Sequence, residues 1–88
     1  MLIRRVSGRS MEPALKAGQL VLARRTKNIK VGDIIIFKHD NLEKIKRVSS
    51  VEKASIIVLG DNRKSSTDSR SFGPIKVEDI IAKVIFSI

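Results

Sequence analysis

The segment Gly8–Pro13 (GRSMEP) carries a serine in a setting that suits acyl transfer. Gly8 stands two residues before Ser10, and Pro13 fixes the chain just after it, so one loop can present the serine hydroxyl together with its own backbone N–H. A nucleophilic serine needs both, the hydroxyl to attack a carbonyl and an N–H to stabilise the oxyanion. Serine after glycine is common in loops, and a loop serine without chemistry is the alternative interpretation.

Lys46 stands in the short segment Ile45–Val48. Side chains alternate along a strand, which places Lys46 on the same face as Val48 and predicts that one of Lys46 and Arg47 points inward. A buried lysine loses the solvation of its charged form, so its pKa falls and the neutral amine accepts a proton. A surface lysine, in a chain with many, is the alternative.

The third segment with chemical potential is Gly60–Gly73, which is dense in hydroxyls and in charges of both signs. Asp68 and Arg70 are close enough in sequence to form an ion pair. The serines and Thr67 can satisfy the loop backbone or orient a neighbouring group. A solvated loop with Asx and Ser turns is the alternative interpretation.

These residues must be positioned by strands, because short runs of Val, Ile and Leu bounded by Gly, Asp or Asn dominate the chain. Such runs predict six strands, over residues 2–6, 19–24, 33–38, 43–51, 55–59 and 80–86. Tight turns are expected at 39–41 and 52–54, a helical turn at 77–80, and at most a short helix over 12–17. The expected fold class is all-β, a small rolled sheet or barrel, with residues 1–88 forming one domain.

The composition excludes several classes of site in this chain of 88 residues. There is no cysteine, which excludes disulfides, thiolate zinc sites and a cysteine nucleophile. His39 is the one histidine, too few for a histidine-based metal site. Trp and Tyr are absent, which argues against a base-stacking surface for single-stranded nucleic acid.

The charge is unevenly distributed. The chain carries +9 overall, and residues 1–47 account for +8 of it. Such a surface fits an anionic partner, either nucleic acid or lipid headgroups, and a merely solvated basic face is an equal alternative. No run approaches the roughly 18–20 apolar residues of a membrane-spanning helix, and we expect neither an anchor nor an export signal.

Four segments follow one another in a fixed order: 8–13, the run Gly32–Phe37 (GDIIIF), 45–48 and 60–73. In this order they resemble the nucleophile, strand, lysine and closing boxes of type I signal peptidases, the Ser/Lys-dyad endopeptidases related to LexA-type self-cleaving repressors. Any one segment is a weak match, whereas the ordered set is specific and covers most of the chain. The resemblance implies the rolled β core of that family.

The resemblance also assigns roles. It implies that Ser10 is the nucleophile and Lys46 the general base, with the Ser10 N–H as an oxyanion donor. It implies that the Ser66 hydroxyl orients the lysine and that Asp68 and Arg70 form the structural ion pair behind it.

Substrate contacts follow from the same resemblance. Val6, Met11, Ile36 and Ile45 stand where the family lines shallow apolar pockets for small residues before the scissile bond. Gly8 replaces a hydroxyl that some members use as a second oxyanion donor. The large accessory β-domain of the family is expected to be absent, because few residues separate Lys46 from the strand at 55–59.

We therefore predict a cytoplasmic serine endopeptidase that removes an N-terminal leader or signal-type peptide from a partner protein and needs no metal or organic cofactor. Ser10 lies near the start of the chain, as in the minimal soluble relatives such as the maturation protease of nickel superoxide dismutase. We expect the basic face to be mainly solvated, with weak peripheral contact with anionic membrane as the lesser alternative, and we expect no specific nucleic-acid binding. The alternatives are a membrane-associated signal peptidase for exported preproteins, a basic nucleic-acid-binding β-barrel, and a non-catalytic relative.

Overall fold

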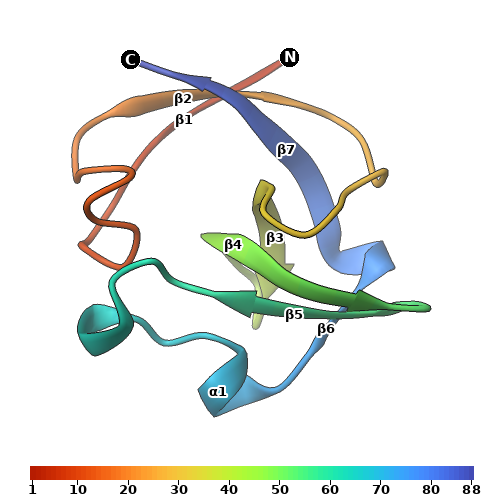
Figure 1. The fold of residues 1–88 in the computed structure, drawn as a ribbon. Coiled ribbons are helices and arrows are strands. Elements are labelled where there is room, and N and C mark those ends of the chain that lie inside the picture. Colours follow the sequence, from red (N-terminus) through yellow and green to blue (C-terminus); the bar gives the residue numbers. More distant parts are fainter.

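The computed structural model describes residues 1–88 and contains one antiparallel sheet of seven strands in the order β1-β2-β7-β3-β4-β5-β6 (Figure 1). The strands are β1 (Leu2–Arg5), β2 (Leu20–Arg24), β3 (Ile34–His39), β4 (Leu42–Glu52), β5 (Ser55–Leu59), β6 (Ile75–Lys76) and β7 (Ile80–Ser87). The helical elements are η1 (Arg63–Ser65), α1 (Ser69–Phe72) and η2 (Val77–Asp79). None of these has the length and apolar character that a membrane-spanning helix requires.

All six expected strands are present, and the all-β fold class is confirmed. The turn between β3 and β4 consists of Asp40 and Asn41, both with positive φ (51° and 63°), which is the backbone that a two-residue hairpin needs and that Asp and Asn tolerate. A similarly short turn at Lys53 and Ala54 joins β4 to β5, so no accessory domain is inserted there. The structure adds the two-residue strand β6, which pairs with β5.

The short helix considered for residues 12–17 does not form. The segment consists of turns, in which Leu15 N–H donates to the Met11 carbonyl over 2.9 Å. The preceding carbonyl, that of Ser10, accepts instead from the Asn62 N–H over 2.7 Å. In a helix over 12–17 the Lys16 N–H would donate to the Glu12 carbonyl, but here it donates to the side-chain oxygen of Gln19.

The sheet rolls up because its register shifts at three places, within the β2–β7, β3–β7 and β4–β5 pairs. Rolling covers both faces of β3. Ile35 and Phe37 pack in one core cluster, while Ile36 packs in another with Ala23 and Ala82. The run of apolar residues in β3 reflects this double burial, since a strand with one solvated face would alternate.

Two of the strand segments that lack a partner on one side flank the same pocket. β1 pairs with β2 alone, and the first half of β4, up to Lys46, pairs with β3 alone, because β5 begins its pairing at Arg47. Between these segments lies a pocket of about 340 Å³, lined by residues 4–7 and 43–46 together with Ser10 and Met11. Unpaired strand edges are where an extended peptide adds to a sheet.

Candidate active site

The two long polar loops meet in the structure. The loop after β1 carries Ser10, and the loop after β5 begins at Gly60. Besides the hydrogen bond from Asn62 to the Ser10 carbonyl, Gly60 lies so close that an added Cβ would stand 2.7 Å from that carbonyl oxygen and would collide with the Ser66 hydroxyl. Only glycine fits at this position, and its close contact with the Ser10 carbonyl fixes the position of the Ser10 backbone relative to the second loop.

Ser10 and Lys46 are brought together. Lys46 Nζ lies 2.8 Å from Ser10 Oγ, and the two residues are 36 positions apart in the chain. Lys46 lies on β4 on the same face as the buried Val48, as alternation predicts, and is 7% exposed. The amine therefore reaches the hydroxyl from a largely desolvated position.

Burial lowers the pKa of Lys46, and the charge of the nearby Lys44 acts in the same direction. The carboxylate of Asp68 opposes the shift, because a negative charge favours the protonated amine, but it does not cancel it. The pKa of Lys46 is thus below the ordinary lysine value, which raises the fraction of neutral amine available to accept the Ser10 proton.

This lowered pKa makes a prediction about stability. Between the folded pKa of Lys46 and its unfolded value near 10.4 the unfolded chain binds more protons, so stability should rise with pH across that window. Below the folded pKa the full penalty of burying a charged lysine applies. Lys46→Met should therefore be at least as stable as wild type at pH 7. Its free energy of unfolding in urea should not show this rise with pH. A clear loss of stability at pH 7 would contradict a destabilising, buried Lys46.

Asp68 is the hub of the second loop. Its fully buried carboxylate accepts from the Gly60 N–H (2.9 Å), the Ser66 hydroxyl (2.8 Å) and Arg70, through the backbone N–H, Nε and Nη2 (3.1, 2.9 and 3.1 Å). Burial pushes the pKa of Asp68 up, but the hydrogen bonds from Arg70, Gly60 and Ser66 outweigh it and hold that pKa well below its usual range. Ser66 thus contacts Asp68, and it makes no hydrogen bond to Lys46.

Three of the four apolar residues expected around the scissile bond line the pocket with Ser10 and Lys46. These are Val6, Met11 and Ile45. Ile36 stands directly opposite Ile45 in the β3–β4 register and packs beside it in the core, but it has no exposed surface and does not line the pocket. The near end of the pocket is therefore apolar.

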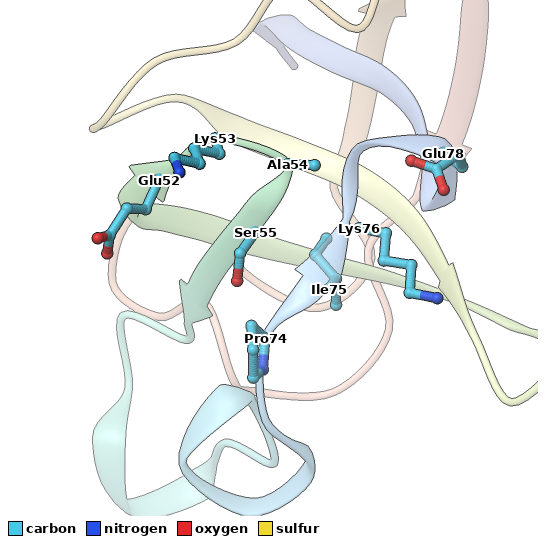
Figure 2. Close-up of a pocket in the computed structure, with 8 residues that line it drawn as sticks. All are labelled: Glu52, Lys53, Ala54, Ser55, Pro74, Ile75, Lys76 and Glu78. Carbon is cyan, nitrogen blue, oxygen red and sulfur yellow. The ribbon is translucent and has the colours of Figure 1, made fainter.

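A larger hollow, of about 740 Å³, lies elsewhere, between the β4–β5 turn and β6 (Figure 2). It contains Ser55, Lys53 and Lys76, but Figure 2 shows both amines pointing away from the serine hydroxyl. The candidate site is therefore the smaller pocket, where the Ser10 hydroxyl and the buried Lys46 amine meet.

The sequence did not predict one contact that anchors the second loop, the ion pair between Arg47 and Asp61. Arg47 donates through Nε and Nη2 to the two carboxylate oxygens of Asp61 (2.8 and 2.7 Å) and through Nη1 to the Gly32 carbonyl (2.8 Å). Since neighbours on a strand face opposite sides, an inward Lys46 implies an outward Arg47. Asp61, its partner, lies 14 residues further along the chain, and no local sequence pattern predicts that the two residues pair.

Comparison with known proteins agrees with this geometry. The model of the family described as signal peptidase, peptidase S26, matches residues 2–51 and 38–88. The chain belongs to this family. The finding favours a peptidase over a basic nucleic-acid-binding barrel.

Two relatives share part of the chain. It is 49% identical over 45 residues to signal peptidase I of Bacillus caldolyticus, a match that covers 51% of this chain and 25% of that protein. It is 44% identical over 36 residues to thylakoidal processing peptidase 1 of Arabidopsis thaliana, covering 41% of this chain and 11% of that protein. The chain thus spans well under two thirds of the length of either relative.

Proposed function

We propose that this protein is a serine endopeptidase in which Ser10 is the nucleophile and Lys46 the general base. The observation that carries the proposal is the 2.8 Å contact between a buried, pKa-lowered amine and a loop hydroxyl. No histidine is needed, because a neutral lysine performs the same proton transfer. Family membership supports the assignment.

The reaction begins when the neutral Lys46 Nζ takes the proton of Ser10 Oγ as the oxygen attacks the substrate carbonyl. The Ser10 backbone N–H donates to no acceptor within the chain and is free to stabilise the oxyanion. The Lys46 ammonium then protonates the leaving amine, and the peptide bond breaks to give an acyl-enzyme on Ser10. Lys46 next deprotonates a water molecule that hydrolyses the ester and restores Ser10.

The substrate class in this proposal is a protein with a cleavable N-terminal leader or signal-type peptide. An extended segment fits between the unpaired edges of β1 and β4, where backbone groups of both strands are available. The residue before the scissile bond then faces Val6, Met11 and Ile45, a small apolar space that suits a small side chain. Asp68, Arg70 and Ser66 act as positioning residues for the loop that contacts Ser10.

The test is cleavage of defined precursors, followed by mass spectrometry of the new N-terminus. The nickel superoxide dismutase precursor represents the short cytoplasmic leaders, and a preprotein with an export signal represents the alternative substrate. Cleavage of either by wild-type protein, and by neither with Ser10→Ala, is the expected result. Which of the two is cleaved decides between the minimal maturation protease and the membrane-associated signal peptidase. Failure to cleave both, or equal cleavage by Ser10→Ala, would reject the proposal.

We also propose peripheral contact with anionic membrane. Ile3, Leu22 and Phe86 stand in register across β1, β2 and β7, and Ile3 and Phe86 are 58% and 60% exposed. Arg5 lies two residues after Ile3 and therefore on the same face. An apolar row beside basic residues suits an interfacial surface, to which each basic residue contributes about 1 kcal/mol. Location in the cytoplasm stays a prediction.

Flotation with vesicles checks this contact. Binding to anionic vesicles should weaken strongly at molar salt. The Debye length, roughly 8–10 Å at physiological salt, becomes much shorter there, so the basic residues are screened from the lipid charges. Phe86→Ser should bind less than wild type at every salt concentration. Equal binding to neutral and anionic vesicles would contradict the electrostatic part of the proposal.

A further inference from the structure

An ion pair spans the pocket beyond its apolar end. Arg4 on β1 donates through Nε and Nη2 to the two carboxylate oxygens of Glu43 on β4, over 2.7 and 3.1 Å. Both side chains are 37% exposed, so the pair is open to solvent and to a bound peptide. It is the link between the two unpaired strand segments that flank the pocket.

The position of the pair relative to Ser10 follows from strand alternation. Arg4 precedes Val6 by two residues, and Glu43 precedes Ile45 by two, so the ion pair lies one side-chain period beyond the apolar end. A peptide bound as a strand also presents every second side chain to the same face. β1 and β4 run in the same direction, and in a peptide that runs parallel to both, with the residue before the scissile bond facing Val6 and Ile45, the residue two positions earlier faces Arg4 and Glu43.

The charge around this pair is positive despite the carboxylate. Lys38 stands directly opposite Glu43 in the β3–β4 register, and Arg25 is near enough to act on the Glu43 carboxylate along with Arg4. Arg4 also keeps donors to spare. Of its five guanidinium N–H groups, two bind Glu43 and one binds the Ile3 carbonyl (3.0 Å), which leaves two for a ligand.

We propose that Arg4 and Glu43 form the subsite for the third residue before the scissile bond and select an acidic side chain there. The inference rests on the proposed peptidase function. The spare N–H groups of Arg4 bind the substrate carboxylate, while the two hydrogen bonds to Glu43 hold the guanidinium at the pocket. Part of the strongly basic character of the chain is thereby assigned to substrate recognition.

Three peptides that differ only at this third position, with Glu, Gln or Lys, test the proposal through the ratio of their kcat/KM values. Wild type should prefer Glu over Gln by about tenfold, the effect of one charge-assisted hydrogen bond, and should cleave the Lys peptide most slowly. In Arg4→Gln the Glu preference should fall below about twofold. Glu43→Gln should increase it, since a competing carboxylate is gone. Lys53→Gln, in the distant β4–β5 turn, is the matched control and should keep the wild-type ratio.

Because each ratio is measured within one variant, a loss of folded protein does not change it. Equal cleavage of the Glu and Gln peptides by wild type, or an unchanged preference in Arg4→Gln, would overturn the subsite and leave the peptidase function standing. Binding of the same peptides to Ser10→Ala tests the subsite independently of cleavage. A Glu preference in binding without any cleavage by wild type would keep the subsite and reject the peptidase function.

Discussion

Replacing Ser10 or Lys46 by alanine is expected to abolish peptide cleavage, with losses on the order of a thousand-fold or more in kcat. The two groups act as a unit. The Ser10 hydroxyl is a weak nucleophile without a base, and the Lys46 amine makes its side-chain hydrogen bond to that hydroxyl. Their 2.8 Å contact is the structural basis. The double variant should be little worse than either single variant.

Lys46→Arg is the sharper test of the lysine, because a guanidinium stays charged at all accessible pH values and cannot act as a base. It should be as inactive as Lys46→Ala although it keeps a positive charge. Lys53→Ala removes an exposed turn lysine and should retain full activity. Thermal unfolding of each variant shows whether it is folded, and substantial turnover by a folded Lys46→Ala would end the dyad assignment.

Asp68→Ala is expected to cause the second largest loss, in stability as well as in activity. It leaves the buried Gly60 N–H without its acceptor, at about 1–3 kcal/mol, and also removes the acceptor of the half-buried Ser66 hydroxyl. Since Gly60 abuts the Ser10 carbonyl, loosening this loop should also displace the nucleophile. Urea unfolding measures the first effect and kcat/KM the second.

The same residue controls stability in acid. The pKa of Asp68 is lower in the folded than in the unfolded state, so its contribution is complete above about pH 4 and is lost as pH falls toward the folded pKa. The free energy of unfolding of wild type should therefore fall steeply as the pH drops through this range, and that of Asp68→Ala should fall less steeply. Glu52→Ala, at the exposed end of β4, is the control and should follow wild type. Parallel acid limbs in wild type and Asp68→Ala would contradict the assignment.

The strands could be predicted because their signals are local. Asp40 and Asn41 have the side chains that a two-residue hairpin tolerates, and the apolar run Ile34–Phe37 has the density of a strand buried on both faces. The two-residue strand β6 had no such signal. It exists because β5 offers it an edge, which only the assembled sheet provides.

The site was predictable only in part. Alternation placed Lys46 on the face of Val48 and predicted that one of Lys46 and Arg47 points inward, and in the structure Lys46 is the buried one. The meeting of the two polar loops depends on contacts between Ser10, Gly60 and Asn62, which no spacing in the sequence encodes. Arg4 entered the sequence interpretation only as part of the +8 charge of residues 1–47, although its position two residues before Val6 implied the same face as Val6.

The most direct test of the central claim is the titration of Lys46 itself. In protein labelled with ¹³C at the lysine side chains, NMR should show one resonance, missing from Lys46→Met, whose pKa lies below the ordinary value near 10.4. The same pKa should mark the limb along which kcat/KM rises with pH. If every lysine titrates near 10.4 while cleavage proceeds at neutral pH, Lys46 is not the neutral base and the proposed mechanism is wrong.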